Sequence, residues 1–332
     1  MVISLKTTLA KRLLSIDLLR IFAVFLVVLL HNSRLPAEIT LLTSPSFIVH
    51  AVAKICVPLF VMVSGALLLG KIELYKVFFR KRTTRILLPW LLWSCIFFFL
   101  EKSSSLFTVV MTRFWFMPMI AGMYLLTPAL RLFVARSKIQ DISYIVLLWF
   151  GGIILLPYLY PSVTFSVGLP GSVVTQVLQF SGYFLLGSLL MRIKKIEHAQ
   201  FLSFVLMLFG VIGAILATVF LNPRPPEYLR FFDYVSPFIV VLSAGVFIWF
   251  RTKFSGVSSP IIITIADASF GIIFVHELFN LFFWHNSQNP LHFMANLPYA
   301  GYDFIRAIIP FVLALIVVLV MRRFTFLRNK LV

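Results

Sequence analysis

The sequence has little charge, and negative charge is the scarcer kind. Charged residues make up 12% of its 332 positions, whereas soluble domains carry about a quarter, and only 11 positions are Asp or Glu. Hydrophobic residues account for 61% of the chain, and the mean hydropathy is +1.02. This composition excludes an ordinary soluble domain and predicts an integral membrane protein.

Motifs that mark a disulfide framework, a metal or a catalytic nucleophile are also missing. The two cysteines, Cys56 and Cys95, both fall within apolar runs, so the sequence indicates no disulfide. There is no metal-ligand spacing, Gly-rich phosphate loop or nucleophile elbow, and we expect no bound metal. The intramembrane carboxylates are too few for an obvious proton-relay path, which weakens a transporter interpretation but does not remove it.

Apolar runs long enough to cross a bilayer, which needs about 20 helical residues, recur along the whole chain. No linker or composition shift separates them, so we predict one all-α, polytopic membrane domain over residues 1–332. The ten predicted spans are 15–33, 47–70, 86–100, 114–133, 142–159, 173–191, 201–221, 234–250, 261–283 and 304–321.

Positive charge is abundant and unevenly placed. The 29 Lys and Arg give a net charge of +18, and most of them lie at every second junction between apolar runs. By the positive-inside rule this pattern places both termini in the cytoplasm, and it indicates contact with membrane lipid rather than with nucleic acid. The densest cluster, KIELYKVFFRKRTTR, is expected to be a cytoplasmic loop between the second and third spans.

The first predicted span carries three ionisable residues, Asp17, Arg20 and His31. Arg20 and His31 are separated by about three helical turns, so their side chains share one face of the helix. Ionisable residues in a span cost about 2.5–3.5 kcal/mol on insertion scales, so such a face usually points into a bundle or wet cavity. The alternative is a helix that begins at Ile21 and leaves Asp17 and Arg20 among the lipid headgroups.

Two parts of the sequence could perform chemistry. Arg80, Arg82 and Arg85 could hold the phosphates of a nucleotide-type donor, because arginine binds phosphate through a bidentate fork. The alternative for these arginines is topology control and binding of anionic lipid. His31 could take a proton from a hydroxyl near neutral pH, or it could be a satisfied structural histidine.

Further candidates lie near the end of the chain and in the fourth span. Ser269 and His276 are spaced to share one helix face, where packing with a hydrogen bond to a neighbouring helix is the favoured interpretation. Trp115 could belong to an interfacial aromatic belt.

Six further pieces of the sequence stand out, in this order: DLLRIFAVFLVVLLH, VPLFVMVSGALLL, FFRKRTTRILLPW, FWFMPMIAGMYLLTP, SGYFLLGSLL and SFGIIFVH. Ser64 lies in the second piece, Trp115 and Tyr124 in the fourth, and Ser269 and His276 in the last. As a set, the pieces resemble the acyltransferase family 3 of membrane-bound O-acyltransferases.

This resemblance implies transfer of an acetyl group from cytoplasmic acetyl-CoA to a sugar hydroxyl of a lipid-linked or surface polysaccharide, such as O-antigen, at a bacterial inner membrane. It implies that His31 acts as general base or acyl carrier, with Arg20 holding the donor or orienting Asp17. The donor phosphates would lie on the arginine cluster, and the substrate or structural candidates are Ser64, Trp115, Tyr124, Ser269 and His276.

The chain departs from the family pattern at two positions. Arg113 stands where members often have histidine, and Phe274 stands where they have tyrosine. The first leaves position 113 without an assigned role, and the second indicates a packing change. A glycan or lipid exporter that uses the same polar cavity without chemistry is the alternative function.

Overall fold

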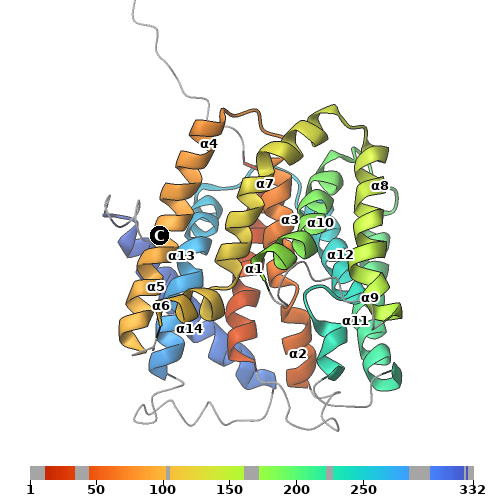
Figure 1. Cartoon of the computed structure of the whole chain (residues 1–332). Coiled ribbons are helices and arrows are strands. Elements are labelled where there is room, and N and C mark those ends of the chain that lie inside the picture. Colours follow the sequence, from red (N-terminus) through yellow and green to blue (C-terminus); the bar gives the residue numbers. More distant parts are fainter. Residues whose placement is uncertain are drawn as a thin grey trace, which may run out of the picture.

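The structure is a computed structural model that describes residues 12–33, 45–101, 105–160, 172–221, 227–283 and 300–324, together with Leu327. The described residues are helical throughout, apart from short connections (Figure 1). The predicted loops at 160–172 and 284–302 lie almost wholly outside the described residues. Among the described residues, 10 helices are long and apolar enough to cross a membrane, which confirms the predicted fold class. These helices are Leu14–Asn32, Ile48–Leu68, Tyr75–Leu100, Phe116–Arg136, Ile139–Leu159, Val173–Arg192, Ala199–Phe220, Arg230–Lys253, Pro260–Phe283 and Tyr302–Met321.

Several of these spans are built from more than one helical element. The elements are α1 (Leu14–Asn32), α2 (Pro45–Ala53), α3 (Cys56–Leu68), α4 (Tyr75–Arg82), η2 (Thr83–Leu87), α5 (Leu88–Leu100), α6 (Leu106–Thr108), η3 (Val109–Arg113), α7 (Phe116–Arg136), α8 (Ile139–Trp149), η4 (Phe150–Leu155), α9 (Leu156–Leu159), α10 (Val173–Arg192), α11 (Ala199–Leu221), η5 (Glu227–Phe232), α12 (Pro237–Lys253), α13 (Pro260–Phe283) and α14 (Ala300–Met321).

The second span is interrupted between α2 and α3, at Lys54 and Ile55. Pro58 follows in the first turn of α3, where its missing N–H is tolerated but removes the hydrogen bond that would join the two helices. The break places Lys54 inside a span, where its Nζ lies 4.6 Å from the centroid of the Tyr234 ring.

The basic segment predicted to be a loop is mostly helix. From Tyr75 the chain runs through α4, the π-helical turn η2 and α5 as one continuous span, which begins well before the predicted residue 86. The segment has no Gly or Pro until Pro89, and Lys and Arg are good helix formers. The prediction was therefore wrong about this segment, and Arg80, Arg82 and Arg85 are held on a helix.

The centre of the molecule is formed by α1 together with α3 and α10, whose spans are the most buried. A Cβ added at Gly65 would clash with the backbone of Phe184, and one added at Gly187 would clash with the backbone of Met62. Only glycine allows α3 and α10 to approach so closely, as small residues do in other membrane helix pairs.

The start of α1 is tied to the start of α13. The backbone N–H of Leu14 donates to the Gly256 carbonyl at 3.1 Å, and the N–H of Ser258 donates to the Arg12 carbonyl at 3.0 Å. The two helices therefore run in parallel from a common level, and α1 also packs against α3, α12 and α14. His31 and Glu277 each lie 17 residues after the first residue of their helix, so both lie about 26 Å along it.

Candidate functional site

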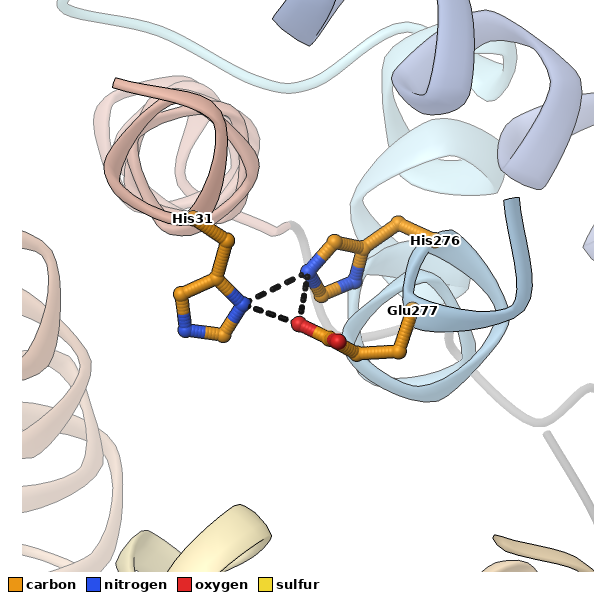
Figure 2. A group of neighbouring side chains, drawn as sticks. All are labelled: His31, His276 and Glu277. Carbon is orange, nitrogen blue, oxygen red and sulfur yellow. Dashed lines mark hydrogen bonds and ion pairs between the residues drawn. The ribbon is translucent and has the colours of Figure 1, made fainter. Parts of the chain in front are cut away.

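A cluster of two imidazoles and one carboxylate forms where α1 and α13 meet (Figure 2). The Nδ1 atom of His31 lies 3.0 Å from Nε2 of His276, and it contacts Oε1 of Glu277 more closely still. His276 Nε2 lies 3.2 Å from the same carboxylate oxygen. His276 is fully buried, whereas 40% of the His31 side chain is exposed, so His31 is the member of the cluster that a substrate can reach.

The hydrogen-bond partners decide which ring nitrogens carry protons. His276 Nδ1 lies 2.8 Å from the Ile272 carbonyl oxygen, which can only accept, so this nitrogen donates. The Glu277 carboxylate likewise accepts, so Nδ1 of His31 donates to it. In a neutral His31 ring the lone pair is then on Nε2, and Figure 2 shows this nitrogen pointing away from Glu277.

Arg113 extends the cluster through Glu277. One guanidinium nitrogen of Arg113 donates to Oε2 of Glu277 at 2.7 Å, and the other donates to Glu101. Arg113 ends the π-helical turn η3, a type of turn that is frequent at functional sites. Glu277 therefore forms an ion pair with Arg113 in a mostly buried position.

His31, Arg113 and Glu277 line a small cavity of about 50 Å³, which we call the inner chamber. Its other walls are mostly apolar or aromatic, and Trp115 and Tyr234 line it with ring centroids 5.2 Å apart. The full lining is Val27, Leu30, His31, Cys56, Val57, Phe60, Arg113, Phe114, Trp115, Phe116, Met117, Tyr234, Ile273 and Glu277.

A second, larger cavity of about 1040 Å³ lies toward the other end of α1, and we call it the basin. This volume is at the upper end of the usual range for small-molecule pockets. Its lining brings together seven of the residues predicted from sequence, namely Arg20, Ser64, Arg80, Arg82, Arg85, Tyr124 and Ser269.

The basin has an excess of positive charge. Seven lining residues are cationic, and Asp267 is the only carboxylate among the described lining residues: the cations are Arg20, Lys71, Arg80, Lys81, Arg82, Arg85 and Arg322. Next to the basin, the hydrogen bond from Lys81 lowers the pKa of Glu73, and burial lowers the pKa of Lys71.

The arginines of α4 and η2 have few anionic neighbours. Arg80, Arg82 and Arg85 form no ion pair with any residue that the structure describes. The Arg82 guanidinium lies 5.0 Å from the Phe78 ring centroid and 5.7 Å from that of Tyr124, and its buried Nε has no hydrogen-bond partner within the described chain. An arginine held in this way is ready to bind an anion.

Arg20 lines the basin on the same helix that carries His31 into the inner chamber. Arg20 lies 3.6 Å from the Asp267 carboxylate and 3.4 Å from Ser269 Oγ. The shared face of α1 therefore runs from one cavity to the other, as its spacing predicts. The helix begins at Leu14, so the alternative start at Ile21 is wrong.

Asp17 is not brought to His31. It lines neither cavity, and its buried carboxylate accepts hydrogen bonds from Arg12 and, at 2.6 Å, from Ser258 Oγ. Its closest contact with Arg20 is 3.9 Å. These contacts make Asp17 an anchor between the start of α1 and the start of α13.

The two cavities share part of their walls. Phe60, Phe116 and Ile273 line both the inner chamber and the basin, so the cavities abut at these three side chains. The rings of Phe60 and Phe116 are 6.5 Å apart between centroids.

Sequence analysis missed Glu277 and Asp267, and it left Arg113 without a role. The signal for Glu277 was present, because a carboxylate inside a predicted span is rare and usually functional. For Arg113 the signal was absent, because its partners Glu101 and Glu277 come from other parts of the chain. At the second position that departs from the family pattern, Phe274 is buried and stacks on Trp93 at 6.0 Å.

The cluster has the donor types of a metal site. One ligand atom from each of His31, His276 and Glu277 lies within 4.8 Å of the others. Arg113, however, already neutralises Glu277 at 2.7 Å, and a second cation there would be repelled. The geometry favours a hydrogen-bonded cluster that orients His31.

Comparison with protein families gives a match over nearly the whole chain. A family model described as an acyltransferase domain matches residues 13–323, which is nearly the whole chain. No curated protein and no solved structure matches the chain.

Proposed function

The chain belongs to the acyltransferase 3 family, and on that premise we propose that it transfers an acetyl group from acetyl-CoA to a sugar hydroxyl. The acceptor we propose is a lipid-linked or surface polysaccharide, such as an O-antigen. The membrane is the inner membrane of a bacterium, with both termini and the basin on the cytoplasmic side.

One observation carries the proposal. A histidine whose Nε2 points away from its carboxylate partner lines a small chamber, and that chamber abuts a large cationic basin. The basin suits a polyanionic donor, and the chamber suits proton transfer at a reacting hydroxyl. A passage for glycan would need neither an oriented imidazole nor an arginine cluster at one end.

In the proposed reaction His31 is the general base. Its Nε2 takes the proton of the acceptor hydroxyl as the oxygen attacks the thioester carbonyl carbon. The carbon–sulfur bond breaks, and the CoA thiolate takes the proton from His31, so the products are the acetyl ester and free CoA. Glu277 is a positioning residue, because it holds Nδ1–H and stabilises the imidazolium that forms, as the carboxylate does in a Ser-His-Asp triad.

We place the phosphates of CoA on Arg80, Arg82 and Arg85. These side chains come from consecutive turns of one continuous helix, and together with Lys71 and Lys81 they line one cavity. Bidentate arginine contacts would fix the donor while its thioester reaches toward the inner chamber.

The acceptor approaches from the other end of α1. His31 is the second-last residue of that helix, so the hydroxyl needs to enter only a short distance. Trp115 and Tyr234 line the chamber, and aromatic side chains are common in the walls of ligand pockets.

The test is a transfer assay with the purified protein in lipid vesicles. Acetyl-CoA labelled in the acetyl group is supplied with surface polysaccharide from a strain that lacks this protein. We expect label to appear in the polysaccharide as an alkali-labile ester and CoA to be released in equal amount. Transport of glycan with no consumption of acetyl-CoA would instead support the exporter.

A further inference from the structure

The contact between the two cavities is apolar. Phe60 comes from α3, Phe116 is the first residue of α7, and Ile273 lies on α13. All three are partly exposed, because each faces both cavities, and we call them the neck. We expect a donor that is bound in the basin to present its thioester to His31 past these side chains.

The chamber beyond the neck is small. Its volume of about 50 Å³ is about a twentieth of that of the basin, which is about 1040 Å³. An acetyl group brings three non-hydrogen atoms past the neck, whereas an octanoyl group brings nine. We therefore expect the longer group to need the walls of the chamber to move.

The walls have little freedom to move aside. Val27, Val57 and Met117 are each less than a tenth exposed and belong to the main apolar core. Close-packed interiors resist the insertion of extra methylene groups, because side chains must leave their preferred rotamers.

We propose that Phe60, Phe116 and Ile273 select the donor by acyl-chain length, so that acetyl and other short acyl groups reach His31 and longer ones do not. This inference rests on the proposed function, because it assumes an acyl-CoA in the basin. It adds the residues that set the specificity, and it explains how one cationic basin that binds any CoA thioester can serve a selective enzyme.

The test compares acetyl-, butyryl- and octanoyl-CoA as donors to the same polysaccharide, in the full-length protein. For the wild type we expect kcat/KM to fall at least tenfold from acetyl to butyryl and octanoyl transfer to be undetectable. Ile273→Ala and Phe60→Ala should raise the butyryl-to-acetyl ratio of kcat/KM at least tenfold. Ile273→Val, a milder change that is expected to fold, should raise it by a smaller factor.

The matched control is Ile272→Ala. Ile272 has the same side chain on the adjacent position of α13, is fully buried and lines neither cavity. Its substitution should leave the butyryl-to-acetyl ratio unchanged. Binding of CoA itself by each variant shows that the basin is intact.

The outcomes separate the two proposals. Equal wild-type transfer of acetyl and octanoyl groups would overturn the proposed role of the neck and leave the proposed acyltransferase function intact. A change of the butyryl-to-acetyl ratio in Ile272→Ala as large as in Ile273→Ala would do the same. Failure of the wild type to bind CoA or to consume any acyl-CoA would overturn both.

Discussion

The basin and the inner chamber lie along the same helices, yet they treat charge in opposite ways. In the basin, seven cations face the cavity and one carboxylate, Asp267, lines it. In the chamber, each charge has a partner, because Arg113 lies between Glu277 and Glu101. The difference indicates that the basin leaves its charge for a ligand, whereas the chamber uses its own charges to hold one imidazole in place.

The largest effect is expected at His31. If its Nε2 takes the proton, His31→Ala should lower transfer about 10²- to 10⁴-fold, the range of general acid–base catalysis. The measurement is the rate of labelled ester formation at saturating acetyl-CoA, with insertion checked by chromatography in detergent. A correctly inserted variant with a nearly normal rate would show that the chamber does not perform the chemistry.

Glu277→Gln should act on the rate and leave donor binding alone. The amide keeps the size of the side chain but removes the charge that stabilises the His31 imidazolium. A charge-assisted hydrogen bond is worth about 1.5–3 kcal/mol, so kcat should fall about 10- to 150-fold. A rise in the KM for acetyl-CoA with unchanged kcat would mean that Glu277 belongs to the donor site.

Substitution of Arg82 should weaken donor binding and leave the rate at saturating acetyl-CoA nearly unchanged. Loss of one charge-assisted phosphate contact predicts a rise of about 10- to 150-fold in the apparent dissociation constant of acetyl-CoA for Arg82→Ala. Arg82→Lys should restore only part of the affinity, since lysine keeps the charge and loses the fork. If lysine restores affinity fully, the arginines act through charge alone, as lipid anchors or topology signals do.

The smallest effect on transfer is expected at Asp17. Asp17→Asn removes one of the two carboxylate partners of Arg12 and weakens the tie between α1 and α13, so the unfolding temperature should fall. Transfer per folded molecule should stay near the wild-type value, because Asp17 lines neither cavity. A loss of transfer comparable with that of Glu277→Gln, at unchanged unfolding temperature, would show that Asp17 belongs to the active site.

The sequence was sufficient to predict the membrane spans and to place Arg20 and His31 on one face of α1. Bilayer thickness sets the length of apolar runs, and the helical period places Arg20 and His31 on one side. These local rules could not show that His31 meets Glu277, because that pairing depends on the level at which α1 and α13 start. That level is fixed by the backbone bonds at Leu14 and Ser258.

The charge pattern also misled the prediction in one place. A dense run of Lys and Arg marks the membrane surface, and this reading assigned a loop to residues that form α4 and η2. Helix propensity at Arg80 and Arg82 pointed the other way. The same limit applies to Arg113, whose partners are too distant in the chain for any spacing rule.

The most direct test of this division between binding and chemistry is the dissociation constant of CoA, measured by titration calorimetry on His31→Ala and Arg82→Ala in the same detergent. The account predicts that His31→Ala binds CoA as the wild type does and transfers the acetyl group about 10²- to 10⁴-fold more slowly. It predicts that Arg82→Ala binds CoA at least tenfold more weakly and, at saturating acetyl-CoA, transfers at nearly the wild-type rate. Wild-type affinity in Arg82→Ala, or lost affinity in His31→Ala, would contradict it.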